Sequence, residues 1–185
     1  MIILLLLRCK HTIRIPVNLE RHKEQYRLKR KENIVFLKRL KKTNPQKLDS
    51  IIHPVHEEVF ACTDCLKCAN CCKTTSPTFT PRDITRISKR LGMSPKEMED
   101  SYLRRDTDED FVLKSTPCTF LGEDNYCNIY DVRPKACQQF PHTNRRRQHQ
   151  LLHLTEKNLE VCPAVFEIVD KLKQQLTLHK INKYE

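Results

Sequence analysis

Apolar residues recur along much of the chain at helical spacing, and prolines and glycines separate the segments. Residues 18–42 are highly charged with a weak apolar seam, which predicts a helix that ends before Asn44-Pro45. A second helical pattern begins at Pro45 and contains Pro54, so we expect this helix to kink or split. The apolar positions are Tyr26, Ile34, Leu37 and Leu40 in the first segment, and Leu48, Ile51, Ile52, Val55 and Val59 in the second.

Capping signals predict two short helices in the middle of the chain. Thr80 is suited to cap the first, with Asp83 three residues later, and Gly92 ends it. Ser94 and Glu97 repeat the same spacing at the start of the second. The run of cysteines just before them, residues 62–72, is too crowded for us to expect regular helix.

Later segments mix short strands with helices, which predicts an α+β fold that is mostly helical. Residues 111–114 favour a strand, and residues 118–121 and 126–130 flank a turn as the arms of a short β-hairpin. Residues 151–154 predict a last strand or turn. Asp131 is expected to cap a helix containing Pro134 and Cys137. A C-terminal amphipathic helix opens at Pro163, with Val165, Ile168, Val169, Leu172 and Leu176 on its apolar face.

Positive charge is concentrated in the first third of the chain. The net charge is +11, and residues 1–60 hold 14 Lys and Arg against 6 Asp and Glu. We therefore predict a basic helical extension, residues 1–44, before a domain of residues 45–185. Such an extension is suited to RNA, DNA, anionic lipid or a protein partner. It is equally well explained as a solvated helix that keeps the protein soluble.

Ten cysteines in 185 residues are the outstanding feature of the composition. A secreted disulfide framework would be equally rich in cysteine. However, the apolar residues 1–7 lack a basic n-region and a small-residue cleavage site, so they are a poor signal peptide. They are also too short to span a bilayer. We therefore expect a small cytoplasmic protein without a membrane segment, whose cysteines bind metal.

The cysteine spacing is typical of thiolate ligands. Cys62, Cys65, Cys68 and Cys71 recur every three residues, and Cys72 follows directly. A Cys-x-x-Cys loop lets two sulfurs converge on one ion, which lowers their pKa values. Adjacent side chains of extended backbone point to opposite sides, so we expect Cys71 and Cys72 to serve different metals or only one to be a ligand. Four cysteines lie downstream, each of which could instead pack as a small apolar side chain: Cys118, Cys127, Cys137 and Cys162.

Together these motifs resemble the YkgJ-type cysteine-cluster family, a zinc- or iron-chelating domain with a CxxCxxCC signature. The matching segments are 65–72 (CLKCANCC), 117–121 (PCTFL), 127–137 (CNIYDVRPKAC), 140–141 (FP) and 162–163 (CP), within about residues 45–176. The resemblance implies a small domain organised around a cysteine-ligated metal centre. It leaves Cys9 and Cys62 outside the pattern. The ligand candidates that it implies are Cys65, Cys68, Cys71, Cys72, Cys118, Cys127, Cys137 and Cys162.

Two metals suit these ligands. Two tetrahedral zinc sites would use all eight cysteines. The C-x2-C-x2-C run, together with a distant Cys-Pro, partly matches the cysteine spacing of bacterial ferredoxins. This partial match slightly favours an iron–sulfur cluster. The hypotheses are a redox or accessory iron–sulfur protein, a zinc-stabilised interaction module that uses the basic arm, and a metal carrier.

Two further side chains are candidates for a role near the metal. Arg133 would either contact the cluster sulfurs or pair with Asp131 or Glu123. His142 would be either a ligand or proton carrier, or a surface histidine. No substrate or reaction is predicted from these residues.

Overall fold

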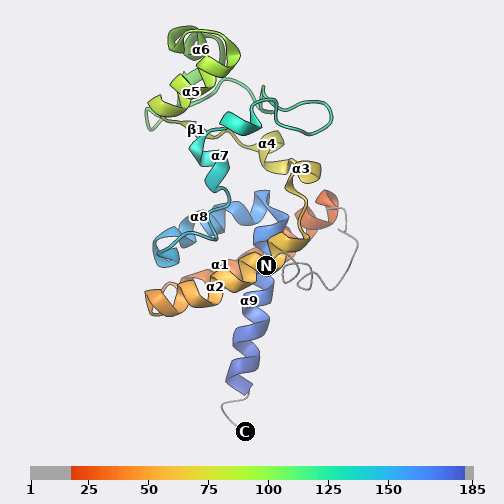
Figure 1. Cartoon of the computed structure of the whole chain (residues 1–185). Coiled ribbons are helices and arrows are strands. Elements are labelled where there is room, and N and C mark those ends of the chain that lie inside the picture. The colour runs from red at the N-terminus through yellow and green to blue at the C-terminus, as the bar shows by residue number, and fades with distance from the viewer. Residues whose placement is uncertain (1–17, 182–185) are drawn as a thin grey trace, which may run out of the picture. The chain divides into compact units, whose positions relative to one another are not determined.

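The computed structural model describes residues 18–181 and divides into two compact units. Unit 1 comprises Met1–Asp64 and Pro141–Glu185, and unit 2 comprises Cys65–Phe140 (Figure 1). The middle of the chain, which holds most of the candidate cysteines, is therefore a unit of its own. Among the described residues, no helix has the length and apolar character needed to cross a membrane.

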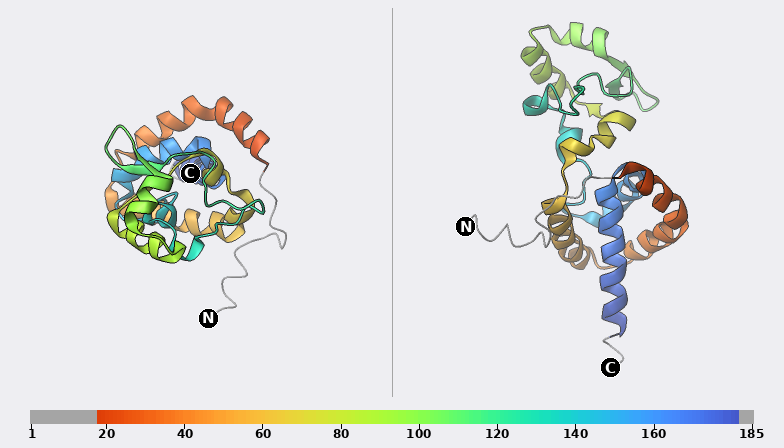
Figure 2. Two further views of the ribbon diagram at one scale, coloured as in Figure 1. Left: turned by 90° about the horizontal axis from the view of Figure 1, so that it is seen from above. Right: turned by 90° about the vertical axis from the view of Figure 1, so that its right-hand side faces the viewer.

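Unit 1 is helical throughout its described elements. Its helices are α1 (Leu19–Leu40), α2 (Pro45–Cys62), α8 (Gln148–Val161) and α9 (Pro163–Ile181). Helices α1 and α2 both pack against α8 and α9, and the same four helices lie together in both views of Figure 2. Their apolar faces form one core. The buried members of that core are Leu37, Leu40, Leu48, Ile52, Val55, Val59, Leu152, Leu159, Ala164, Val165, Phe166, Ile168, Val169 and Leu172.

The predicted starts of the first two helices are confirmed. The Asn18 side chain accepts a hydrogen bond from the Arg21 N–H at 2.9 Å, and Asn44 accepts one from the Lys47 N–H at 3.1 Å. Such caps satisfy amide groups that a helix start would otherwise leave without partners.

Helix α2 runs unbroken through Pro54, so of the two expected outcomes, a kink or a split, the split is wrong and the kink stays a prediction. A proline inside a helix costs about 3 kcal/mol. On the same helix Leu48, Ile52, Val55 and Val59 are all buried. Full burial of four such side chains contributes at most about 6–12 kcal/mol. Even when this value is reduced by roughly 40% to allow for a compact unfolded chain, it exceeds the cost of the proline. Packing of the apolar face therefore keeps the helix continuous.

The predicted strand or turn at residues 151–154 is also wrong, because these residues lie inside α8. The buried residues of α8 are Gln148, Leu152, Thr155 and Leu159, which is helical spacing. The start of α8 is capped from α2, since the Asp49 carboxylate accepts the Arg147 and Gln148 N–H groups, each at 2.8 Å. The short apolar run was ambiguous by itself, and packing against α1 and α9 decides it.

Unit 2 contains the two helices whose caps were predicted, α5 (Pro81–Leu91) and α6 (Pro95–Tyr102). Both begin with complete capping boxes, at Thr80 and Ser94, and both predictions are confirmed. Gly92 ends α5 with a φ of 70°, a left-handed conformation that glycine adopts without strain.

A small antiparallel sheet completes unit 2 and confirms the α+β class. Its strands are β1 (Thr78–Phe79), β2 (Leu103–Arg105) and β3 (Phe111–Leu113), in the order β1-β3-β2. The strand predicted at residues 111–114 is thus confirmed. The hairpin predicted at residues 118–130 is reduced to one bridge between Leu121 and Cys127, and β2 with β3 forms the hairpin instead.

The apolar side chains of unit 2 form a separate core between its helices and its sheet. This core supports the loops that carry the downstream cysteines, since Cys118 and Cys127 pack against it. Its buried members are Phe79, Ile84, Ile87, Met98, Leu103, Leu113, Phe120 and Ile129.

The helix predicted after Asp131 begins later than expected. A 3₁₀ turn, η1 (Tyr130–Val132), comes first, and α7 (Lys135–Gln139) follows it. Pro134 occupies the cap position of α7, and Asp131 instead lies 3.5 Å from Arg90 in an exposed ion pair. A carboxylate from α5 serves the start of α7, as described below.

Candidate metal centre

The CxxCxxCC segment folds as two short helices, α3 (Cys65–Cys68) and α4 (Asn70–Thr74). The expectation that this run would not be helical is therefore wrong. Ala69 separates the helices with a φ of 47°, and its N–H still donates to the Cys65 carbonyl at 2.9 Å. A residue in the left-handed conformation changes the direction of the chain, so Ala69 ends one short helix and lets a second one begin directly after it.

Cys71 and Cys72 are neighbours on α4, and a hydrogen bond joins their thiols. The expectation that they diverge assumed extended backbone, whereas adjacent side chains of a helix are about 100° apart. The bond from Cys71 lowers the pKa of Cys72 to about 7, although burial acts in the opposite direction; Lys73 lowers it further. Whether the two sulfurs serve different metals stays a prediction.

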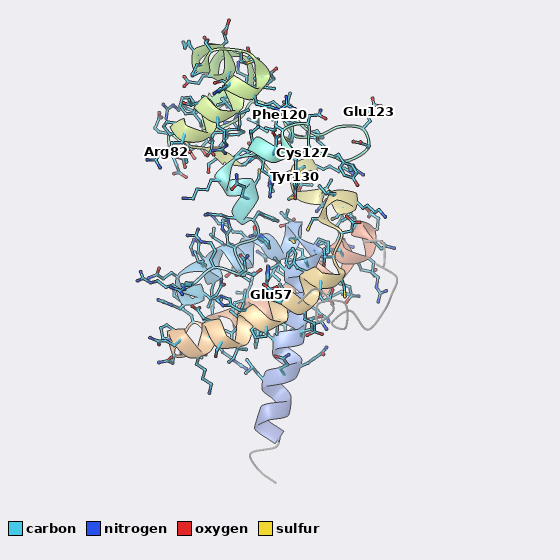
Figure 3. The ribbon with its side chains drawn as sticks, in the orientation of Figure 1. Glu57, Arg82, Phe120, Glu123, Cys127 and Tyr130 are labelled. Carbon is cyan, nitrogen blue, oxygen red and sulfur yellow. The ribbon has the colours of Figure 1, made fainter. Side chains whose placement is uncertain are left out.

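Backbone hydrogen bonds bring the second cysteine segment to α4. The Cys118 N–H donates to the Cys72 carbonyl at 2.8 Å. Beyond Cys118 the chain makes a tight loop that returns at Cys127, closed by the Leu121–Cys127 bridge. Figure 3 shows Cys127 near Phe120 and Tyr130, with Glu123 at the tip of the loop. Both cysteines are thus fixed at the base of one loop.

Helix α7 supplies Cys137, and a buried carboxylate on α5 anchors this helix. Asp83 accepts a hydrogen bond from the Lys135 N–H, the first amide of α7, at 3.1 Å. Arg86 pairs with Asp83 at 2.6 Å and also donates to the Arg133 carbonyl at 2.9 Å. The segment that carries Cys137 is therefore tied to α5 by charge-assisted hydrogen bonds.

Four thiols of unit 2 lie within electrostatic range of one another. Burial raises the pKa of Cys137 to about 12, and Cys72, Cys118 and Cys127 each raise it further. Burial also raises the pKa values of Cys118 and Cys127, and Cys72 adds to both shifts. Mutual influence of this kind requires short separations. Cys72 of the CxxCxxCC run thus influences the three downstream thiols of the same unit electrostatically.

The other candidates have different surroundings. Cys65 is exposed on α3, and Cys68 and Cys71 are half-buried. Cys162 belongs to unit 1, where it ends α8 and precedes α9, and its N–H donates to the Asn158 carbonyl at 2.8 Å. Cys9 lies outside the described residues. All eight candidates carry thiols rather than disulfides.

A family model for the CxxCxxCC family, with the description "Putative zinc- or iron-chelating domain", matches residues 64–163. The chain belongs to the CxxCxxCC family. The match spans every candidate cysteine from Cys65 to Cys162, and it leaves out Cys62, as expected. It is shorter than the anticipated range of residues 45–176. Neither the comparison with curated proteins nor that with solved structures finds a match.

The donor set of this CxxCxxCC domain fits the metals that the family description names. Zinc and four-iron clusters both take four thiolates. Cys72, Cys118, Cys127 and Cys137 provide four thiols from separate segments. Among the residues that the structure describes, no three cysteine, histidine, aspartate or glutamate side chains form a group that could hold an ion. Binding therefore requires these side chains to turn towards a common centre.

Arg133 borders the cysteines of the domain without joining an ion pair in the described chain. Its guanidinium stacks on the Tyr130 ring, with 3.9 Å between the guanidinium carbon and the ring centroid, and donates to the Tyr130 carbonyl at 2.7 Å. The expected pairing with Asp131 or Glu123 is therefore not formed. Its charge lowers the pKa values of Cys127 and Cys137, although burial of these thiols outweighs it.

His142 falls in unit 1, in a left-handed conformation with a φ of 71°. Its Nδ1 is buried without a hydrogen-bond partner, and burial lowers its pKa. The expected surface histidine is therefore half-buried instead.

The sequence did not identify Asp83 and Arg86 as residues of the centre. The capping signal at Thr80 did mark Asp83, but only as part of a helix start. The link to α7 joins residues 52 positions apart, so local spacing carries no sign of it. Packing of α5 against η1 creates that link.

Proposed function

We propose that this protein binds metal as a thiolate centre, either an iron–sulfur cluster or zinc, with Cys72, Cys118, Cys127 and Cys137 as one ligand group. The observation that carries the proposal is the match of residues 64–163, which include these four cysteines, to the family model. The 2.8 Å hydrogen bond from the Cys118 N–H to the Cys72 carbonyl and the electrostatic influence of the thiols on one another support it. A four-thiolate centre requires cysteines from separate segments to converge, and these four would do so by turning their side chains towards a common point.

The remaining ligand candidates are Cys65, Cys68, Cys71 and Cys162. Their support comes from the family match and from the cysteine spacing. Eight sulfurs would complete two four-thiolate sites. When bound, zinc would cross-link the segments of the fold, and an iron–sulfur cluster would in addition carry single electrons.

The chain's own residues would prepare the centre. Asp83 holds the start of α7 and so limits the positions that Cys137 can take. The Cys118 N–H bond to Cys72 holds two ligand segments together before any metal arrives. Arg133 places a positive charge beside the thiolates, which reduces their mutual repulsion. We also propose a cytoplasmic location, because a reducing compartment keeps such thiols available for metal.

The decisive experiment is anaerobic purification followed by metal analysis and visible spectroscopy. Bound iron with visible colour supports an iron–sulfur protein with a redox or accessory role. Zinc without colour supports a structural module, and rapid metal exchange with a chelator supports a carrier. Cys118→Ser should lose metal, whereas Ser101→Ala, at an exposed position of the same unit, should retain it. Wild-type protein free of both metals would refute the proposal.

A further inference from the structure

Helix α1 has two faces of different character. One face packs in the core of unit 1 through His22, Asn33, Leu37 and Leu40. The opposite side carries a basic strip, which we define as Arg27, Lys31, Lys38 and Arg39, all exposed. At 1.5 Å per residue the strip is about 18 Å long. Helical spacing therefore places the buried residues of α1 on one face and the exposed cations on the other, where they do not contribute to the core.

The cations of the basic strip have no ion-pair or hydrogen-bond partner among residues 18–176, whose side chains the structure describes, in contrast to several lysines of the same unit. Lys29 pairs with Asp170 at 2.7 Å, and Lys171 pairs with Glu58 at 2.9 Å. The acidic residue within this stretch of α1, Glu32, is engaged by Lys173 of α9 at 2.8 Å. The side chains of the basic strip are thus left without a paired carboxylate, although the exposed Glu24 lies three residues before Arg27.

Helix stability explains only part of this charge. Lys38 and Arg39 lie in the last turn of α1, where positive charge interacts favourably with the helix dipole. Arg27 and Lys31 lie further from the end and are four residues apart, a spacing at which like charges repel. A binding partner of negative charge would remove that repulsion.

We infer that the basic strip binds the phosphate backbone of double-stranded nucleic acid. This inference goes beyond the metal centre proposed above and does not depend on which metal the cysteines hold. A line of cations along one helix complements the regular line of phosphates on a duplex. Because phosphate contacts carry no base information, binding is independent of nucleotide sequence.

The composition of the strip distinguishes a duplex from other partners. Protein interfaces concentrate aromatic side chains and are depleted in lysine, whereas this surface has only Leu28 and Val35 as exposed apolar residues, 72% and 49% exposed. Single strands are bound by stacking on aromatic rings. The aromatic side chains of α1, Tyr26 and Phe36, are packed against the core instead.

The test measures anisotropy of a labelled 24-base-pair DNA duplex, and of the same duplex in RNA, as salt is varied with the full-length, metal-loaded protein. Four phosphate contacts give a slope of log affinity against log salt of about −3.6, or a loss of about 150-fold between 50 and 200 mM. The strip variant Arg27→Gln/Lys31→Gln/Lys38→Gln should reduce the slope to about −0.9. Binding to either duplex supports the inference, and the two arms show which nucleic acid is preferred.

A matched control removes one arginine and two lysines from exposed positions elsewhere, Arg82, Lys89 and Lys157, each replaced by Gln. It should keep the wild-type slope. Equal losses in both triple variants would overturn the inference, because net charge alone would then explain binding. Absence of duplex binding at 50 mM salt would also overturn the inference. So would a result in which Leu28→Ser/Val35→Ser loses binding while the strip variant keeps it, because the apolar side chains and not the cations would then bind the duplex. Metal content, measured in parallel, should be the same in all variants. A variant that lost metal would report on the metal centre and not on the basic strip.

Discussion

Replacing Asp83 with Ala should destabilise unit 2 and loosen the helix that carries Cys137. Only 2% of the Asp83 side chain is exposed. One of its oxygens accepts from Arg86 and the Lys135 N–H, at 2.6 and 3.1 Å. The other accepts from the Thr80 N–H and hydroxyl, at 3.0 and 2.6 Å. Burial raises the pKa of Asp83, but these four bonds outweigh it and hold the pKa below the ordinary value, so the group is a carboxylate at neutral pH.

The size of the effect follows from these contacts. Loss of a helix cap costs about 1 kcal/mol. Breaking a buried ion pair costs about 3–5 kcal/mol, and the lower end applies because the Arg86 side chain is 38% exposed and water can replace part of the pair. We therefore expect Asp83→Ala to lower the free energy of unfolding by about 3–4 kcal/mol. Asp83→Asn keeps the shape and some acceptors, so its loss should be smaller.

Urea unfolding followed by circular dichroism would measure the total loss, and amide hydrogen exchange at residues 135–139 would locate it. Asp100→Ala removes the partner of an exposed ion pair with Lys96 in the same unit and serves as the control, with no measurable change expected. A loss below about 1 kcal/mol in Asp83→Ala, with unchanged exchange in α7, would refute the anchoring role.

Three further outcomes are expected. Cys68→Ser or Cys137→Ser should give insoluble or molten protein, since a structural metal contributes on the order of 10 kcal/mol to folding; unchanged thermal melting in the presence of chelator would contradict this. Burial lowers the pKa values of His22, His56 and His142, so their contribution to the stability of unit 1 is present above about pH 6.5 and is lost as pH falls through their folded pKa values. Melting temperatures from pH 7.5 to 5.5 would test this, and the dependence should weaken in His22→Asn. Leu48→Ala should cost about 2–5 kcal/mol in urea unfolding, because Leu48 is fully buried, whereas Leu28→Ala at an exposed site should cost almost nothing.

Local signals in the sequence determined most of the helices and the identity of the metal-binding motif. Caps at Asn18, Asn44, Thr80 and Ser94 act over three or four residues, so their pattern is visible without the fold. The cysteine spacing indicated the family in the same way, and the matched residues 64–163 confirm it. Each of these features depends on residues that are close together in the chain.

Tertiary structure decided what depends on distant contacts. Packing made residues 151–154 part of α8 and kept α2 continuous through Pro54, because burial of apolar faces outweighs local preference. It also joined Asp83 to the start of α7 and Cys118 to Cys72, across 52 residues in the first case. The sequence could name the cysteines as ligand candidates. Only the fold of unit 2 brings Cys72 within electrostatic range of the three downstream thiols, because that proximity arises from contacts between segments that no local pattern encodes.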